Sequence, residues 1–69
     1  MSAPLVTDPN IEDQDGFYAA LLAAHDGLSA EESAALDARL VLILANHVGE
    51  RAVLDAALAL ALEAGGPAP

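Results

Sequence analysis

The stretch Leu40–Leu44, LVLIL in one-letter code, decides the fold, because it places five branched apolar residues in succession inside a predicted helix from Ser29 to His47. With successive side chains turned by about 100° around a helix axis, these five reach every side of it. A helix that is apolar on all sides is a buried helix. The stretch therefore predicts a helix that is surrounded by the rest of its domain or by another chain.

The predicted helix has two apolar faces separated by a narrow polar strip. Leu36, Leu40, Ile43, Leu44 and His47 form one face, and Ala34, Ala38, Val41, Ala45 and Val48 form the other. We expect Leu40, Ile43 and Leu44 to pack between two neighbouring helices. Leu42 lies outside both faces, so it is expected to contact another chain, together with Val41 and Val48.

The strongest boundary signal lies at the start of this helix. Ser29 followed by Glu32 matches the capping box, in which each side chain bonds to the backbone of the other residue. A preceding helix is predicted from Gln14 to His25, and its apolar stripe consists of Phe17, Leu21, Ala24 and Leu28. Because only a short turn around Gly27 separates the two helices, they are expected to form an antiparallel hairpin.

A third helix is predicted after Gly49, a residue suited to the left-handed end of a helix. It begins at Glu50 and runs to about Ala64, with Leu54, Leu58 and Ala61 at the centre of its apolar stripe. The expected organisation is an extended arm over residues 1–12, broken by Pro4 and Pro9, an all-α three-helix domain over 13–64, and a flexible tail over 65–69.

The size and cysteine content favour association with another chain. A domain of 69 residues is marginally stable alone, and small domains usually gain stability from disulfides, a metal or a partner. With no cysteine in the chain, disulfides and thiolate metal sites are excluded. Oligomerisation or docking on another protein is the remaining means.

The charge excludes two classes of partner. A net charge of −9 with no lysine argues against binding to nucleic acid or to an anionic membrane surface, both of which require cationic side chains. An acidic surface keeps an apolar-rich chain soluble, although an acidic decoy for a basic protein surface is an alternative. With no targeting segment or spanning helix evident, a cytoplasmic protein is expected.

The polar residues of the sequence do not indicate a catalytic or metal-binding function. Asp13 and Asp15 precede a helix, where capping explains them without a cation, and His25 and His47 each end a helix. The two histidines are expected to lie on the order of 20 Å apart in a hairpin, too far for one metal site. We therefore expect no catalytic residue, no metal and no cofactor.

Arg39 is the one basic residue without an acidic neighbour three or four positions away, whereas Arg51 has Asp55. Arg39 is expected either to lie solvated along apolar surface or to pair with an acid such as Asp15 or with a partner chain. We therefore add it to the predicted interface of Val41, Leu42 and Val48.

Two segments carry a resemblance to a known family: FY…HDGLSAEES at residues 17–33, and ARL…ANHVG at residues 38–49. Over about residues 10–62 the chain resembles short proteobacterial proteins catalogued as domain of unknown function 2783. The resemblance supplies no catalytic residue. It implies an association with flavin-dependent hydroxylases of aromatic compounds, and hence an accessory role.

The sequence thus predicts a small, acidic, non-catalytic helical interaction protein. A homodimer and an accessory subunit on a larger enzyme both remain open, because either would cover Leu42. The alternative function is an acidic regulatory decoy that binds a basic protein surface. A metal or catalytic role would require a dimer that joins His25 of one copy with His47 of the other.

Overall fold

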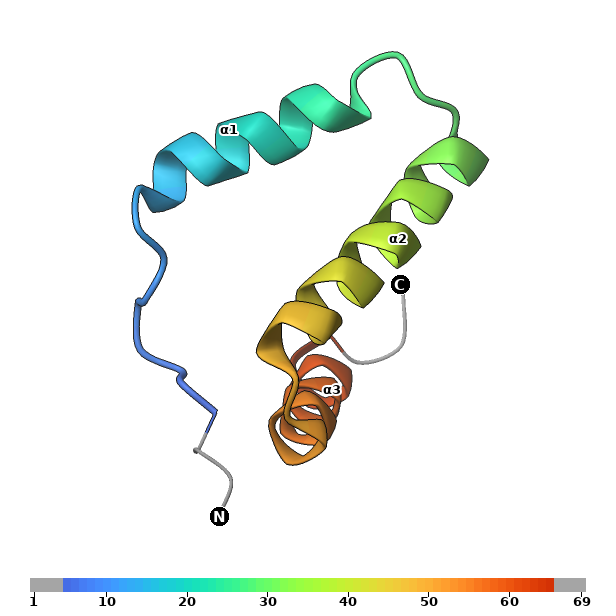
Figure 1. The fold of residues 1–69 in the computed structure, drawn as a ribbon. Coiled ribbons are helices and arrows are strands. Elements are labelled where there is room, and N and C mark those ends of the chain that lie inside the picture. Colours follow the sequence, from blue (N-terminus) through green and yellow to red (C-terminus); the bar gives the residue numbers. More distant parts are fainter. Residues whose placement is uncertain (1–4, 66–69) are drawn as a thin grey trace.

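Three helices make up the secondary structure of the computed structural model, which describes residues 5–65. They are α1 (Gln14–His25), α2 (Ala30–Val48) and α3 (Arg51–Gly65), in that order along the chain (Figure 1). Residues 5–11 precede α1 without helix or strand. The predicted all-α, three-helix fold class is confirmed, while the predictions for residues 1–4 and 66–69 lie outside the described residues.

Helix α1 begins with a cap that explains a glycine in its first turn. Asp13 adopts a left-handed conformation, with φ 51°, and its carboxylate accepts a hydrogen bond from the Gly16 N–H at 3.2 Å. A Cβ atom at Gly16 would collide with that carboxylate. The glycine therefore lowers helix propensity but leaves room for the cap. At the other end, Gly27 takes the left-handed conformation with φ 78°, as predicted.

Helix α2 begins with the predicted capping box. The Glu32 N–H donates to the Ser29 hydroxyl oxygen at 3.1 Å, and the Ser29 N–H donates to the Glu32 carboxylate at 2.9 Å. The helix ends at Gly49, which has φ 76° and whose N–H bonds to the Ala45 carbonyl. Both boundaries agree with the sequence-based expectation.

Helix α3 follows after a very short turn. Its first backbone bond runs from the Leu54 N–H to the Glu50 carbonyl at 3.1 Å, and the helix extends to Gly65, one residue beyond the predicted end. In Figure 1, α3 is viewed nearly along its axis while α2 lies across the view, so the two helices cross steeply. Helices α1 and α2 run in opposite directions and diverge from their turn (Figure 1).

The prediction that Leu40–Leu44 belongs to a buried helix is wrong within this single chain. No residue between 5 and 65 is buried, and Ile43 is 65% exposed. Leu40 is half-buried, while Leu44 is 49% exposed. The physical reason is the spread of the helices: α1 diverges from α2 and α3 crosses one end of it, so neither helix covers its full circumference.

The accessible surface and the radius of gyration also show that the helices are loosely packed. The accessible surface of 5971 Å² exceeds by about 1,900 Å² the value of roughly 4,000 Å² expected for a compact monomer of 7.0 kDa. The radius of gyration is 13.8 Å, against roughly 11 Å for a compact domain of this length. Residues 5–11, which form no helix or strand, and the exposed apolar side chains of the helices contribute to this excess.

Among residues 5–65, no helix combines the length and hydrophobicity needed to cross a membrane.

Candidate interaction surface

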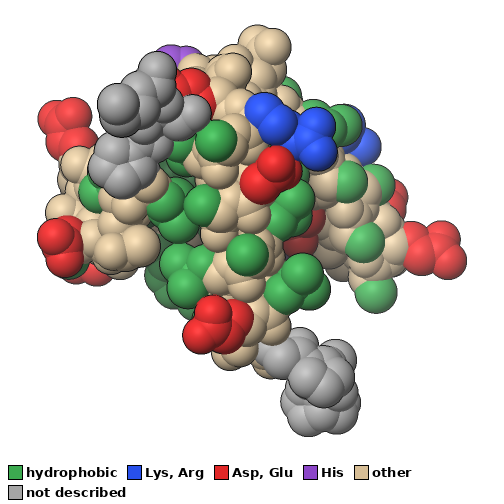
Figure 2. Space-filling model, turned by 90° about the horizontal axis from the view of Figure 1, so that it is seen from below, with side chains coloured by type: hydrophobic (Ala, Val, Ile, Leu, Met, Phe, Trp, Pro, Cys, Tyr) green, Lys and Arg blue, Asp and Glu red, His purple; other side chains and the backbone are tan. Residues whose placement is uncertain are grey.

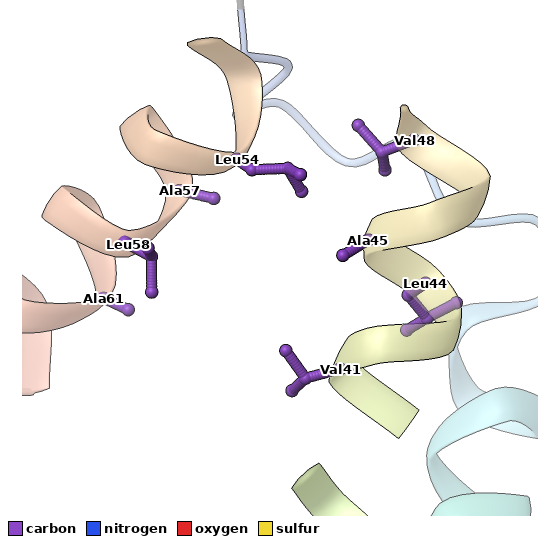
Figure 3. Close-up of a pocket in the computed structure, with 8 residues that line it drawn as sticks. All are labelled: Val41, Leu44, Ala45, Val48, Leu54, Ala57, Leu58 and Ala61. Carbon is purple, nitrogen blue, oxygen red and sulfur yellow. The ribbon is translucent and has the colours of Figure 1, made fainter. Parts of the chain in front are cut away.

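An apolar groove of about 380 Å³ lies between α2 and α3. Eight residues line it: Val41, Leu44, Ala45, Val48, Leu54, Ala57, Leu58 and Ala61. Figure 3 shows the side chains of the two helices directed toward one another across an open space. No lining residue carries a charge or a side-chain hydrogen-bonding group. We call this feature the α2–α3 groove.

The two walls of the α2–α3 groove have the same spacing. In each helix, the second, third and fourth lining residues follow the first by three, four and seven positions, beginning at Val41 in α2 and at Leu54 in α3. This is the spacing with which one helix face packs against neighbouring helices. Each wall is therefore a helix-packing stripe that the other wall covers only in part, since Ala45, Leu54 and Ala57 are half-buried while Val41 and Leu58 are 61% exposed.

The turn at Gly49 explains why the two stripes face each other but pack together only in part. The chain passes from Val48 to Arg51 in a tight turn, so α3 departs from the end of α2 and diverges from it (Figure 3). Three lining residues are alanines, whose single methyl group does not reach across the opening. Space therefore remains where a bundle would have a packed core.

A second, smaller groove of about 170 Å³ lies between α1 and α2. It is lined by Phe17, Ala20, Leu21, Ala24, Leu36 and Leu40. Near the turn, His25 Nε2 lies 2.9 Å from Asp37 Oδ1, which links the two helices. The predicted stripe of the first helix thus faces the second helix, and His25 has an acidic partner that the sequence analysis does not anticipate.

The four predicted interface residues fall into two groups. Val41 and Val48 line the α2–α3 groove. Leu42 lies outside both grooves with 70% of its surface exposed, and Arg39 is also exposed. Within residues 5–65, Arg39 forms no hydrogen bond or ion pair, so the pairing considered with Asp15 does not occur in the single chain.

The apolar stripe of α3 was predicted from its periodicity, without the groove that it borders. Leu54, Leu58 and Ala61 form a wall of an open groove, and Leu44 and Ala45 belong to the opposite wall. Hydrophobic periodicity marks which side of a helix is apolar, but it does not show whether the same chain covers that side. The sequence therefore predicted the apolar side of α3, but not whether that side is covered by the same chain.

Several carboxylates are engaged in bonds within the chain. Asp13 and Glu32 cap helices, and Asp37 contacts His25. The hydrogen bond that Arg51 donates to Asp55 at 2.8 Å, reinforced by the attraction between their charges, raises the pKa of the Arg51 guanidinium. Figure 2 shows hydrophobic side chains spread across one face of the molecule, with several acidic side chains toward its edges.

The histidine and acidic side chains of the described residues do not gather into a metal-binding group. Between residues 5 and 65, no group of three or more histidine or acidic side chains is placed to hold a metal ion. No serine or threonine hydroxyl in this range is hydrogen-bonded to His25. His47 lies ten residues beyond Asp37 on α2, about 15 Å along the helix axis, so the two histidines do not share a site.

No curated protein and no solved structure matches the chain. A family described as "Protein of unknown function (DUF2783)" matches residues 5–63, a range that includes all of α1 and α2 and nearly all of α3. The matched range thus contains both walls of the α2–α3 groove. The chain belongs to the DUF2783 family.

Proposed function

We propose that this protein is a non-catalytic interaction protein that associates with another protein chain through the α2–α3 groove. The observation that carries the proposal is the absence of any buried residue between 5 and 65 in a chain that is 55% hydrophobic. Burial of apolar surface is the main favourable contribution to folding and to association. Association completes the core that the single chain leaves open.

The amount of exposed surface supports this proposal. The chain as a whole exposes about 1,900 Å² more than a compact monomer, and four residues that line the groove are each at least 45% exposed: Val41, Leu44, Val48 and Leu58. Large contiguous apolar patches on soluble proteins generally mark interaction sites. The groove also matches helix-in-groove recognition, in which a partner helix presents apolar residues at three- and four-residue spacing.

The acidic-decoy alternative has less support. A decoy needs free carboxylates arranged along one outer face, whereas Asp13, Glu32 and Asp55 form bonds to groups of their own chain. The α2–α3 groove carries no charge. A partner larger than this chain, such as an enzyme that the protein serves as an accessory subunit, is compatible with the same groove.

Two alanine substitutions in α3 test the proposal. Ala61 lines the groove and Ala59 does not, so Ala61→Asp and Ala59→Asp make the same change in side chain and in helix propensity. The tagged chain would be purified at native expression and the mass of the intact complex measured. We expect a complex heavier than the 7.0 kDa chain for the wild type and for Ala59→Asp, but not for Ala61→Asp.

Two results would contradict the proposal. One is a wild-type chain that remains a well-folded monomer at micromolar concentration with no associated protein. The other is a complex that persists unchanged in Ala61→Asp, because the groove would then not be the contact surface.

A further inference from the structure

We infer that the occupant of the α2–α3 groove is a second copy of this chain, in a symmetric dimer whose core is built by α2 and α3 of both copies. This inference rests on the proposed function, since it names the partner of the same surface.

Each wall of the groove has room to pack against one further helix. Each wall is a stripe with the spacing that helices use in bundles, and the two stripes face an open space. Two further helices laid against the open sides of α2 and α3 close such a space, because each apolar stripe then packs against another helix. A second copy supplies two helices that carry these same stripes, and a symmetric dimer joins the same patch on both subunits.

The side chains of the walls also complement one another in size. The α3 wall alternates leucine and alanine, from Leu54 through Ala57 and Leu58 to Ala61. Helices pack by placing large side chains of one into depressions on the other. A leucine of one copy can therefore sit against an alanine of its partner, so a single sequence provides both the projecting and the receding surface.

The exposed area fits a dimer that folds together. Obligate dimers bury about 2,000 Å² or more in total, or at least about 1,000 Å² from each chain. The whole chain exposes about 1,900 Å² more than a compact monomer, and exposed large side chains of α2 and α3, among them Val41, Leu58 and Leu62, supply part of that surface. Obligate interfaces are also the most apolar class, in agreement with a groove that lacks any charged residue.

The distribution of charge makes association of two acidic chains possible. Each copy carries −9, so the copies repel one another. The described acidic residues lie outside the groove lining, and Asp55 is paired with Arg51. The repulsion therefore acts at the periphery of the contact, where solvent and salt screen it. A basic partner, by contrast, would find no acidic side chain in the groove itself.

Mixed-label NMR spectroscopy and light scattering test the inference on the full chain. A sample with equal amounts of isotope-labelled and unlabelled copies reveals contacts between copies directly. We expect nuclear Overhauser effects between copies from the methyl groups of Val41, Val48, Leu54 and Leu58, and a mass twice the 7.0 kDa of one chain. Ala61→Asp should raise the dimer dissociation constant by at least about 100-fold and Ala59→Asp by less than about threefold.

The possible outcomes separate this inference from the proposed function. A chain that is monomeric by itself, yet binds a different protein in an Ala61-dependent manner, would overturn the inference and leave the proposed function intact. A monomer that binds nothing would overturn both. Contacts between copies confined to Phe17 and Leu36 of the other groove would show a dimer joined elsewhere, and this too would overturn the inference. Because the labelled experiment uses the wild type, it does not depend on a variant that folds.

Discussion

At Gly49 the backbone takes a conformation that residues with a Cβ atom adopt at a cost. Its φ is 76°, and the nearest atom to an added Cβ would be the Asn46 carbonyl oxygen at 3.8 Å, an ordinary contact. The cost of Gly49→Ala is therefore conformational and not steric, and we expect a loss of about 1 kcal/mol in unfolding free energy. Chemical denaturation at fixed protein concentration measures it.

Gly65→Ala is the matched control for this substitution. Gly65 ends α3 without a positive φ and has nothing near an added Cβ. We expect Gly65→Ala to leave the denaturation midpoint unchanged or slightly raised, since alanine favours helix formation. Equal midpoints for Gly49→Ala and Gly65→Ala would show that the turn does not depend on the left-handed conformation.

Ser29 gives a second prediction for a single residue. Its hydroxyl oxygen accepts from the Glu32 N–H at 3.1 Å, and no other group in α2 replaces this bond after Ser29→Ala. We expect a loss of about 1 kcal/mol in unfolding free energy, measured by urea denaturation. Ser33→Ala, within the first turns of the same helix, removes a serine that makes no capping bond and should not destabilise the chain.

Residue-level features were predictable from the sequence where the signal is local. The roles of Ser29, Gly27 and Gly49 follow from preferences that act over a few residues, and the structure confirms all three. The capping role predicted for Asp13 is confirmed, whereas its left-handed conformation and the contact between His25 and Asp37 were not predicted. The first is an uncommon conformation for aspartate, and the second depends on how two helices are spaced.

Within the helix α2, Leu40 and Leu42 have different surroundings although they are only two positions apart. Leu40 is half-buried in the groove between α1 and α2, whereas Leu42 is 70% exposed and lies outside both grooves. Periodicity located the helices within one residue of their observed ends. It could not show that α1 diverges from α2 or that α3 crosses it steeply, because crossing geometry depends on side-chain packing between elements.

This difference predicts opposite effects for two aspartate substitutions. Leu40→Asp places a charge against Phe17 and Leu36 in the smaller groove, and we expect helix content to fall and unfolding free energy to drop by at least about 2 kcal/mol. Leu42→Asp should preserve helix content, and any loss of association would show that the contact surface extends beyond the α2–α3 groove. Circular dichroism and light scattering of both variants provide the measurement. If both substitutions unfold the chain equally, Leu42 is not part of an intermolecular surface.

The molecule as a whole has well-defined helix ends but few side chains packed between its helices. Helices α1 and α2 are well capped, yet the described residues contain no buried side chain, so single-chain packing contributes little to the stability of the fold. A small domain in this condition gains stability from whatever binds its folded form. The stability of the folded chain therefore depends on the forces that hold it to another chain.

Ionic strength distinguishes a second copy from a basic partner. Two chains of −9 repel each other, so salt should strengthen their association by screening that repulsion. An acidic chain that binds a basic surface loses affinity under the same change. We expect the dimer dissociation constant to fall by a few-fold between about 20 mM and 500 mM sodium chloride, where the Debye length shortens from about 20 Å to about 4 Å.

Sedimentation equilibrium across a range of protein concentrations measures this dissociation constant at each ionic strength. Sodium chloride suits the titration better than sulfate, because sulfate also strengthens apolar burial and would raise association for a second reason. Ala59→Asp is the internal control, because it adds one negative charge outside the groove and should increase the salt response without removing the dimer. A dissociation constant that rises with salt would mean that charge attraction holds the complex together, and the apolar groove would then not be its main source of affinity.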